Sequence, residues 1–276
     1  MTLDPEQLGQ SKADLAETLR TLRKRAGLSQ VRLAGRCNVS QSKISKIETA
    51  EITPSLVDVE LILRALGAPE QLVAEVTALA RLANTEWQPI RSSWRRGLEK
   101  RQAELAGLET ESRELRYFLP AMITGLLATP EYIRASLEYS PGDVSKTVAR
   151  KLSRQAVLYD STKHFTFLLT EQAARWAVVP PPAMAVQIDH LASLSHLPNV
   201  RIGLIPIGTA INRGPMNTFT VYDDRLATVE TFTGRTVFRD ARDINEHLDV
   251  FREYEQKAHF GDTARTLLQE WATLYR

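Results

Sequence analysis

Four polar side chains on one short segment have the chemistry needed to read DNA bases. A glutamine amide can form two hydrogen bonds with adenine, and a lysine ammonium can bind guanine, both in the major groove. On a helix over residues 41–48, these side chains point away from the apolar pair Ile44 and Ile47, and no acidic residue precedes Glu48. We expect base contacts from Gln41, Ser42, Ser45 and Lys46.

The stretch from Leu28 to Glu48 predicts two short helices that would position these side chains. Ser29 and Ser40 each precede a helical pattern, and a serine hydroxyl can accept a hydrogen bond from a free backbone N–H at a helix start. Asn38 falls between the helices and tolerates the left-handed conformation of a tight turn. The spacing of the apolar residues places an inward face on the first helix, made of Leu33, Ala34 and Cys37.

The charge of the N-terminal region favours a nucleic-acid partner. Residues 1–50 carry four Lys and five Arg against two Asp and three Glu, a net charge of +4, whereas the whole chain has only +2. Binding to DNA depends strongly on neutralising phosphates, and a local basic excess is expected of one DNA-facing module. The alternative is a five-helix bundle that makes protein contacts alone.

Residues from about Asp14 to Ala83 resemble the lambda-repressor-like (XRE) helix-turn-helix family. The resemblance includes LAETLRTLRKRAGLSQ before the motif and TPSLVDVELILRALG after it. It implies that Arg23 and Glu48 form a partly buried structural ion pair. It also implies phosphate contacts, which we assign to Gln30, Ser40 and Lys43. One departure is that Thr49-Ala50 replaces the glycine that usually follows the position of Glu48.

The bulk composition indicates a globular chain of two domains. A domain usually takes about 100–200 residues, and this chain has 276, of which 43% are hydrophobic. A single cysteine, Cys37, excludes an intrachain disulfide framework. No stretch approaches the roughly 18–20 apolar residues of a membrane span, and the start, MTLDPEQLGQ, lacks the features of a secretion signal. We therefore expect a cytoplasmic protein without a membrane partner, associated with the nucleoid when bound to DNA.

The remaining sequence predicts an α/β domain with a mixed sheet. We expect a disordered tail over 1–12, the helix-turn-helix domain over 13–85, a linker over 86–104 and the α/β domain over 105–276. Helical patterns alternate with strand patterns and then give way to adjacent strands, which is typical of such a sheet. A helix is predicted from residue 104 to near Pro120. Strands are predicted at HFTFLL, NVRIGLIPI, NTFTVYDD, LATVETFTG and TVFRD.

The segment GLLATPEYIRA resembles the PGLLQTxxYARA signature of a domain of uncharacterised function found in WhiJ-like actinobacterial regulators. RQAVLYD, FLLTEQAARW, LPNVRIGLIPI and VETFTG follow in the expected order, so the resemblance covers about residues 105–276. Here Ala121-Met122-Ile123-Thr124 separates the proline from Gly125, which departs from the pattern. The resemblance implies transcription control, with this domain sensing a small-molecule effector or a small partner protein.

No catalytic or metal-binding pattern occurs in the second domain. His190 and His196 are six residues apart, which does not place them on one helical face, and the common nucleotide and hydrolase motifs are absent. Arginines in or near strands are weak candidates for an anion site, namely Arg201, Arg213 and Arg235. The basic residues of the helix predicted over 143–159 are expected on a solvated face, namely Lys146, Arg150, Lys151 and Arg154. We expect no metal, no cofactor and no enzyme activity.

Together these patterns predict a sequence-specific DNA-binding transcriptional regulator. One recognition helix reads few bases, so we expect a homodimer on a palindromic or repeated double-stranded operator, with half-sites about 34 Å apart. The second domain would carry the dimer surface and sense the effector. One alternative is an antitoxin-like protein whose second domain binds a small protein encoded nearby. Another is an enzyme fused to a DNA-binding module, which converging carboxylates or a nucleophile–base pair in a cleft would favour.

Overall fold

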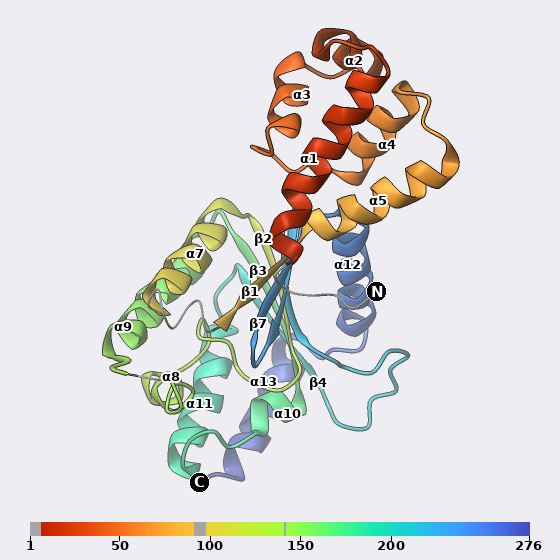
Figure 1. Cartoon of the computed structure of the whole chain (residues 1–276). Helices are drawn as coiled ribbons and strands as arrows, with labels where there is room; N and C mark the ends of the chain where they lie inside the picture. The colour runs from red at the N-terminus through yellow and green to blue at the C-terminus, as the bar shows by residue number, and fades with distance from the viewer. Residues whose placement is uncertain (1–6, 91–97, 141) are drawn as a thin grey trace. The chain divides into compact units, whose positions relative to one another are not determined.

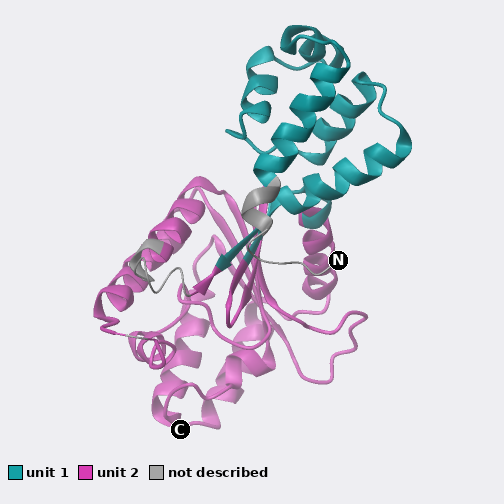
Figure 2. Cartoon of the chain, in the orientation of Figure 1, with its two compact units in different colours: residues 1–88, 236–243 teal, residues 89–235, 244–276 magenta. Residues whose placement is uncertain are grey.

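The computed structural model describes residues 7–90, 98–140 and 142–276, and these form two compact units. The first unit contains Met1–Gln88 and Thr236–Asp243, and the second contains Pro89–Arg235 and Ile244–Arg276 (Figure 2). The second unit therefore contributes nearly all of the predicted α/β domain. The short segment 236–243 returns to the first unit, which the sequence did not indicate.

Five helices make up most of the first unit (Figure 1). They are α1 (Gln7–Arg25), α2 (Gln30–Cys37), α3 (Gln41–Glu48), α4 (Leu56–Ala65) and α5 (Glu70–Asn84). Apolar residues from all five meet in one core, with Leu19, Leu33 and Ile44 each only 1% exposed. Since each helix is amphipathic, packing their apolar faces together stabilises helices that would be too short to persist alone.

Two of the expected boundaries fall inside regular structure. Helix α1 begins at Gln7, so residues 7–12 of the expected tail are helical. The expected linker 86–104 contains most of strand β1 (Thr85–Pro89) and the first residues of helix α7 (Leu98–Glu111). Residues 1–6 of the tail and 91–97 of the linker lie outside the described residues.

A seven-stranded mixed sheet confirms the predicted α/β class. Its order is β1-β7-β6-β5-β2-β3-β4. Strand β2 pairs in parallel with β3, and β3 with β4, whereas β2–β5 and β5–β6 are antiparallel. The strands after β1 are β2 (Glu114–Leu119), β3 (His164–Thr170), β4 (Val200–Ile205), β5 (Thr218–Tyr222), β6 (Leu226–Thr231) and β7 (Gly234–Phe238).

The prediction of one helix from residue 104 to near Pro120 was wrong in its second half. Helix α7 ends at Glu111, and Glu114–Leu119 form β2 in the interior of the sheet. Leu115, Tyr117 and Leu119 alternate into one core, while the Phe118 ring stacks on Tyr254 at a centroid distance of 4.3 Å. Glu114 and Arg116 are half-buried, whereas the last three residues of β2 are all buried, so polar and apolar residues alternate over only its first four positions.

Helices cover both faces of the sheet. The face of Leu115 and Tyr117 forms the larger core with apolar residues of several helices, among them α8 (Pro130–Ala135), α9 (Ser145–Arg154), α10 (Glu171–Arg175), α11 (Pro181–Leu194) and α13 (Gly261–Thr273). Phe118 and Phe219 contact aromatic residues of α12 (Ala241–Glu255). A 3-10 helix (Gln155–Tyr159) continues α9, and the short α10 (Glu171–Arg175) follows β3.

Candidate nucleic-acid interface

The turn between α2 and α3 forms through the side chains expected from the sequence. The Ser29 hydroxyl accepts a hydrogen bond from the Arg32 backbone N–H, 3.2 Å away, and the Ser40 hydroxyl accepts one from Lys43, 3.1 Å away. Asn38 adopts the left-handed conformation with φ 52°, and its N–H bonds to carbonyls at the end of α2. These contacts fix the start of α3, which is the helix that carries the candidate base-reading side chains.

Helix α3 divides into a buried and an accessible face. Ile44 and Ile47 are each 1% exposed in the core. The expected base-contacting residues Gln41, Ser42 and Lys46 are exposed, and Ser45 is half-buried. Of the expected phosphate contacts, Ser40 is exposed, whereas Gln30 and Lys43 are half-buried. The base-contacting set therefore shares one helix, and Gln30 comes from α2 beside it.

A buried ion pair connects α1 to α3. Arg23 donates from Nε and Nη2 to the two carboxylate oxygens of Glu48, at 2.5 and 2.7 Å, and from Nη1 to the Leu28 carbonyl at 2.7 Å. Their side chains are 11% and 4% exposed. The structure thus brings this expected pair together with bidentate geometry, which is the strong form of an arginine–carboxylate contact.

The same carboxylate positions a glutamine pair that the sequence reasoning missed. Gln30 donates from Nε2 to Glu48 Oε2 at 2.9 Å, and its own Oε1 accepts from Gln41 Nε2, also at 2.9 Å. A chain of contacts therefore runs from Arg23 through Glu48 and Gln30 to Gln41. Spacing along the sequence gives no sign of it, since Gln30 and Gln41 are on different helices.

Charge around Glu48 keeps its carboxylate ionised. Burial raises the pKa of Glu48, but hydrogen bonds from Arg23 and Gln30 and the Arg23 charge lower it more, so its pKa lies below the ordinary value. An ionised Glu48 can accept from Arg23 and Gln30 together. The Gln30 amide is thereby fixed, which leaves its oxygen to receive the Gln41 amide.

Both lysines of α3 have acidic neighbours. Lys43 Nζ lies 2.7 Å from Asp58 of α4, whose carboxylate also completes a capping box with Ser55. Lys46 Nζ lies 3.3 Å from Glu51, with both side chains about half exposed. An exposed pair of this kind contributes little, so Lys46 can exchange Glu51 for DNA at small cost. Lys43 is held more firmly, because Asp58 is 15% exposed.

The departure from the family pattern after Glu48 has a structural consequence. Ala50 has φ 56°, a left-handed conformation that alanine rarely adopts. Its N–H bonds to the Ile47 carbonyl at 3.1 Å, so the turn that follows α3 forms without glycine. The motif keeps its geometry at the cost of local backbone strain.

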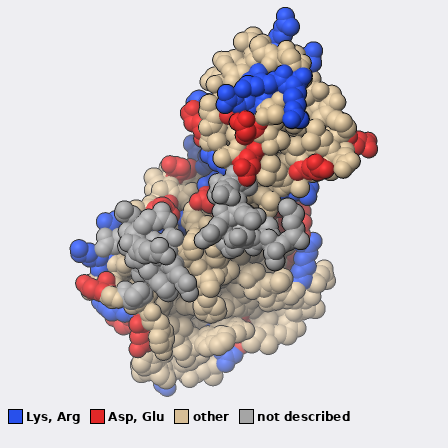
Figure 3. All heavy atoms as spheres, in the orientation of Figure 1, with Lys and Arg blue, Asp and Glu red and all other residues tan. Residues whose placement is uncertain are grey.

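Basic side chains gather on the surface of the first unit. The view in Figure 3 shows a blue cluster over the part of α1 nearest α2. The last turn of α1 contains Arg23, Lys24 and Arg25, of which Lys24 and Arg25 are exposed. Such a surface suits the phosphate backbone of DNA.

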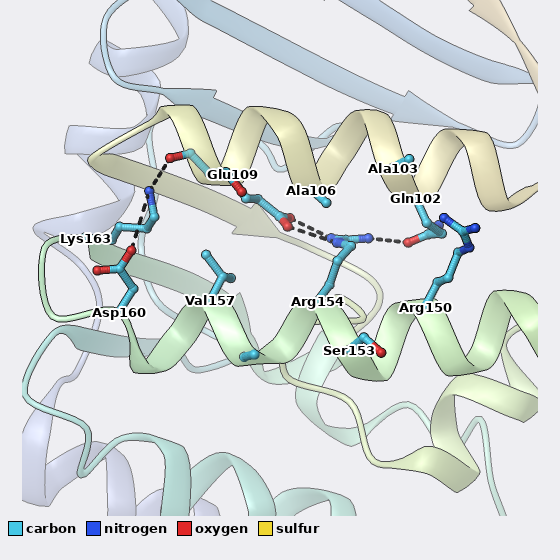
Figure 4. A pocket seen from close by; sticks show the side chains of 12 residues that line it. Gln102, Ala103, Ala106, Glu109, Arg150, Ser153, Arg154, Val157, Asp160 and Lys163 are labelled. Carbon is cyan, nitrogen blue, oxygen red and sulfur yellow. Dashed lines mark hydrogen bonds and ion pairs between the residues drawn. The ribbon is translucent and has the colours of Figure 1, made fainter.

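The second unit contains two neighbouring cavities beside α7 and α9. One measures 480 Å³ and is shown in Figure 4, and the other measures 360 Å³. Both are lined by Gln102, Glu109 and Arg154. Arg154 donates from Nε to Glu109 Oε2 at 2.9 Å and from Nη2 to Oε1 at 2.6 Å, and it also contacts Gln102 (Figure 4).

These contacts correct the expectation that the basic residues of α9 lie on a solvated face. Lys146 and Arg150 are exposed, but the Arg154 side chain is only 10% exposed and Lys151 is half-buried. The available signal was helical spacing: Lys151 lies four residues after Thr147 and three after Val148, and both of these are buried. The inward face of α9 was predicted from its apolar residues alone. Lys151 and Arg154 lie on the same face and were therefore missed.

The strand arginines considered for an anion site all have carboxylate partners. Arg201 contacts Glu255 at 2.7 Å, Arg213 contacts Glu246 at 2.5 Å, and Arg235 contacts Glu104 at 2.9 Å. Within the described residues, no group of three or more His, Cys, Asp or Glu could hold a metal ion. No helix in that part of the chain has the length and apolar character needed to cross a membrane.

Comparison with known families agrees with the two units. A helix-turn-helix domain model matches residues 14–76, so the first unit contains such a domain. The model described as Domain of unknown function (DUF5753) matches residues 102–270, more than half of the chain. The chain therefore belongs to the DUF5753 family. No curated protein matches the chain.

Solved structures give only distant likenesses. Nuc from Salmonella typhimurium, a phospholipase D family member, has 7% identity and a TM-score of 0.35, covering 58% of this chain and 90% of that one. NucT from Helicobacter pylori has 9% identity and the same TM-score, covering 63% and 96%. The archaeal chromatin protein TrmBL2, whose structure shows a novel mode of DNA binding, has 12% identity and a TM-score of 0.31, covering 64% and 53%. At these TM-scores the likenesses carry nothing about the function of this chain.

Proposed function

We propose that this protein is a sequence-specific DNA-binding transcriptional regulator without enzyme activity, acting in the cytoplasm on the nucleoid. The observation that carries the proposal is the exposed, non-acidic face of α3 on a helix-turn-helix domain. Gln41, Ser42, Ser45 and Lys46 are the proposed base contacts, since the first residues of the second helix reach base edges in this motif.

The glutamine pair supports Gln41 as the main specificity determinant. Its amide is held by Gln30, which is held in turn by Glu48. A side chain fixed in advance loses less rotamer entropy on binding, and entropy loss is a large cost of ordering side chains at an interface. Gln30 and Ser40 are proposed to contact phosphates on either side.

Lys43 is proposed to bind phosphate from within its ion pair with Asp58. Replacing Lys43 with methionine should weaken binding to all sequences alike and make the dependence on salt less steep. Replacing Arg81, an exposed arginine of α5 that is not among the proposed contacts, should change neither. Equal salt slopes for wild type and Lys43→Met would remove Lys43 from the contact set.

The regulator is proposed to act as a homodimer with an effector-sensing second unit. Two copies are needed because one recognition helix reads too few bases, and a twofold protein matches a palindromic or repeated operator. An effector that binds one arrangement of the dimer better would shift the population towards it. The cavities beside α7 and α9 support this role for the second unit.

A second candidate is an antitoxin-like protein whose second unit binds a small protein encoded nearby. The apolar side chains exposed on that unit favour it, since Met216 is 86% and Phe232 fully exposed. Co-purification of the neighbouring gene product with wild type, and its loss in the double variant Met216→Ser, Phe232→Ser, would support this reading. Retention by the double variant would locate any such contact elsewhere.

A further inference from the structure

The 360 Å³ cavity of the second unit is lined by apolar and by polar side chains, and the two sets are called its apolar wall and its polar wall. Its volume lies in the range of small-molecule sites, which are mostly apolar with a few placed polar groups. The apolar wall comes from α7, β2, the loop between β2 and α8, α8 and the turn after α8, and is made of Leu105, Leu119, Met122, Ile123, Ile133 and Leu137. Lys151 of α9 and Tyr222 of β5 belong to the polar wall.

Three cations line this cavity, and two of them are neutralised. Arg154 pairs with Glu109 and Arg101 pairs with Glu230. Lys151 forms no hydrogen bond or ion pair with any described residue. The cavity lining therefore has one more positive than negative charge, and the unpaired positive charge is that of Lys151.

The position of Lys151 is fixed by the loop before α8. A Cβ placed on Gly125 would lie 3.5 Å from Lys151 Cδ, so the lysine stem packs directly over this glycine. Gly125 opens the GLLATPEYIRA segment singled out in the sequence. That segment therefore holds the stem of the unpaired cation.

A second donor in the cavity also lacks a partner. Tyr222 is 2% exposed, and its hydroxyl has no hydrogen bond within the described part of the chain. Burial, followed by the nearby charge of Glu109, raises the pKa of Tyr222, so the hydroxyl stays protonated and able to donate. The neighbouring Tyr117 differs, because its hydroxyl already donates to Glu109 Oε1 at 3.3 Å.

An unpaired cation in such a place is unfavourable for the folded protein. Burial lowers the pKa of Lys151 to about 8; the charges of Arg154 and Arg101 act in the same direction, and the charge of Glu230 opposes them. A buried charge needs a partner to offset its lost hydration. A bound anion would supply that partner and raise the pKa of the lysine towards its ordinary value.

We propose that this cavity binds a small organic acid, with its carboxylate on Lys151 and Tyr222 and its apolar body against the wall of Leu119, Ile123 and Ile133. The binding site itself does not depend on the proposed function. Only the role of this acid as the effector of the regulator rests on that proposed function. A neutral apolar ligand would leave the cation unpaired, and an amine would add a second positive charge beside it.

Isothermal titration of the full-length protein with octanoate at pH 7 tests the site, with octan-1-ol and inorganic phosphate as comparison probes. Wild type should bind octanoate at least ten-fold more tightly than either probe. Lys151→Met should weaken octanoate binding at least ten-fold, and Tyr222→Phe about three-fold. Lys146→Met, an exposed lysine on the same helix, should bind like wild type.

Absence of octanoate binding, or equal binding by Lys151→Met and wild type, would overturn the inference. Phosphate binding as tight as that of octanoate would overturn the choice of an organic acid. If Lys151→Met does not fold, Tyr222→Phe carries the same test, and its equality with wild type overturns the role of the polar wall. DNA binding by the same preparations without octanoate separates the two proposals, since its loss with octanoate binding intact contradicts only the proposed function.

Discussion

Gln41 is already hydrogen-bonded before any DNA is present. Its Nε2 donates to Gln30, and the carboxylate that fixes Gln30 is fixed by Arg23 in turn. On binding adenine, Gln41 would use both its amide N–H and its oxygen, so the contact with Gln30 must be kept through the remaining amide hydrogen or exchanged. Specificity at this position should thus depend also on Arg23 and Glu48, which are not proposed to touch DNA.

Replacing Gln41 with alanine should relax base preference at one operator position. The expected loss of discrimination is about 1–3 kcal/mol, the usual contribution of a good bidentate pair. Binding of an operator library by wild type and variant measures it. Gln71→Ala provides the control, since Gln71 is an exposed glutamine on α5, and it should leave preferences unchanged. An unaltered preferred operator in Gln41→Ala would show that the reading face is assigned wrongly.

Glu48 should make the first unit sensitive to acid. Its folded pKa lies below the ordinary value, so its stabilising contribution is complete above the unfolded pKa of about 4.3 and is lost as pH falls through the folded pKa. Glu48→Gln leaves Arg23 without its carboxylate and should cost about 3 kcal/mol at pH 7. Urea unfolding of both proteins from pH 7 to pH 3 should show the difference shrinking with acid. A constant difference would contradict this assignment.

Lys151 should have the opposite effect on stability, at alkaline pH. Its folded pKa of about 8 lies below the unfolded value near 10.4, so the cost of burying the charge is complete below pH 8 and disappears as pH rises to about 10.4. The surrounding groups are Arg101, Arg154, Glu109, Glu230 and the cavity tyrosines. Without ligand, Lys151→Met should be more stable than wild type at pH 7, by up to about 3 kcal/mol.

The measurement for Lys151 is the unfolding free energy of wild type and Lys151→Met between pH 7 and pH 10.5. The advantage of the variant should fall steadily across this window. Lys146→Met should differ little from wild type throughout, because Lys146 is exposed. A variant less stable than wild type at pH 7 would mean that the ammonium has a stabilising contact and is not an unpaired cation.

At the scale of elements, the turn after α3 has a strained backbone at Ala50. A glycine at this position would adopt the same conformation without strain. Ala50 has φ 56°, and an L-residue pays roughly 1–2 kcal/mol for the left-handed region. Part of this is offset because glycine loses more backbone entropy on folding. Ala50→Gly should therefore raise the unfolding free energy by about 0.5–1 kcal/mol while leaving operator preference unchanged.

The matched control for this turn is Ala74→Gly, at an exposed position inside α5. There the same substitution should cost about 1 kcal/mol, because glycine disfavours a helix interior. Thermal unfolding of the two variants should thus shift in opposite directions. A loss of stability in both would show that the conformation of Ala50 is not a source of strain.

Helices with an N-cap residue, and helices or strands with apolar residues on one face, could be predicted from the sequence. The caps at Ser29 and Ser40 and strand β4 all follow from local patterns. Strand β2 could not, because its polar and apolar residues alternate over only four positions, too few to separate a strand from the helical pattern that precedes it. The contact of Gln30 with Gln41 and the inward cations of α9 were missed for another reason: they depend on which helices meet, and local spacing does not encode that.

At the scale of the whole molecule, charge is divided unevenly along the chain. The net charge is +2, yet residues 1–50 alone have +4. Residues 51–88 carry six acidic and two basic residues, a net charge of −4, so the basic excess belongs to the segment of α1, α2 and α3 and not to the first unit as a whole. A protein built this way should bind DNA through one module, with affinity that falls steeply as salt rises.

The most direct test is binding of the purified full-length protein to fragmented genomic DNA from its source, repeated with a variant that lacks residues 1–85. Our account predicts a few sharp sites with internal twofold symmetry or repeats, half-sites about one helical turn apart, and their loss on truncation. Diffuse, salt-sensitive binding without sharp sites, or sharp sites that persist in the truncated protein, would contradict the claim that α3 reads a specific operator.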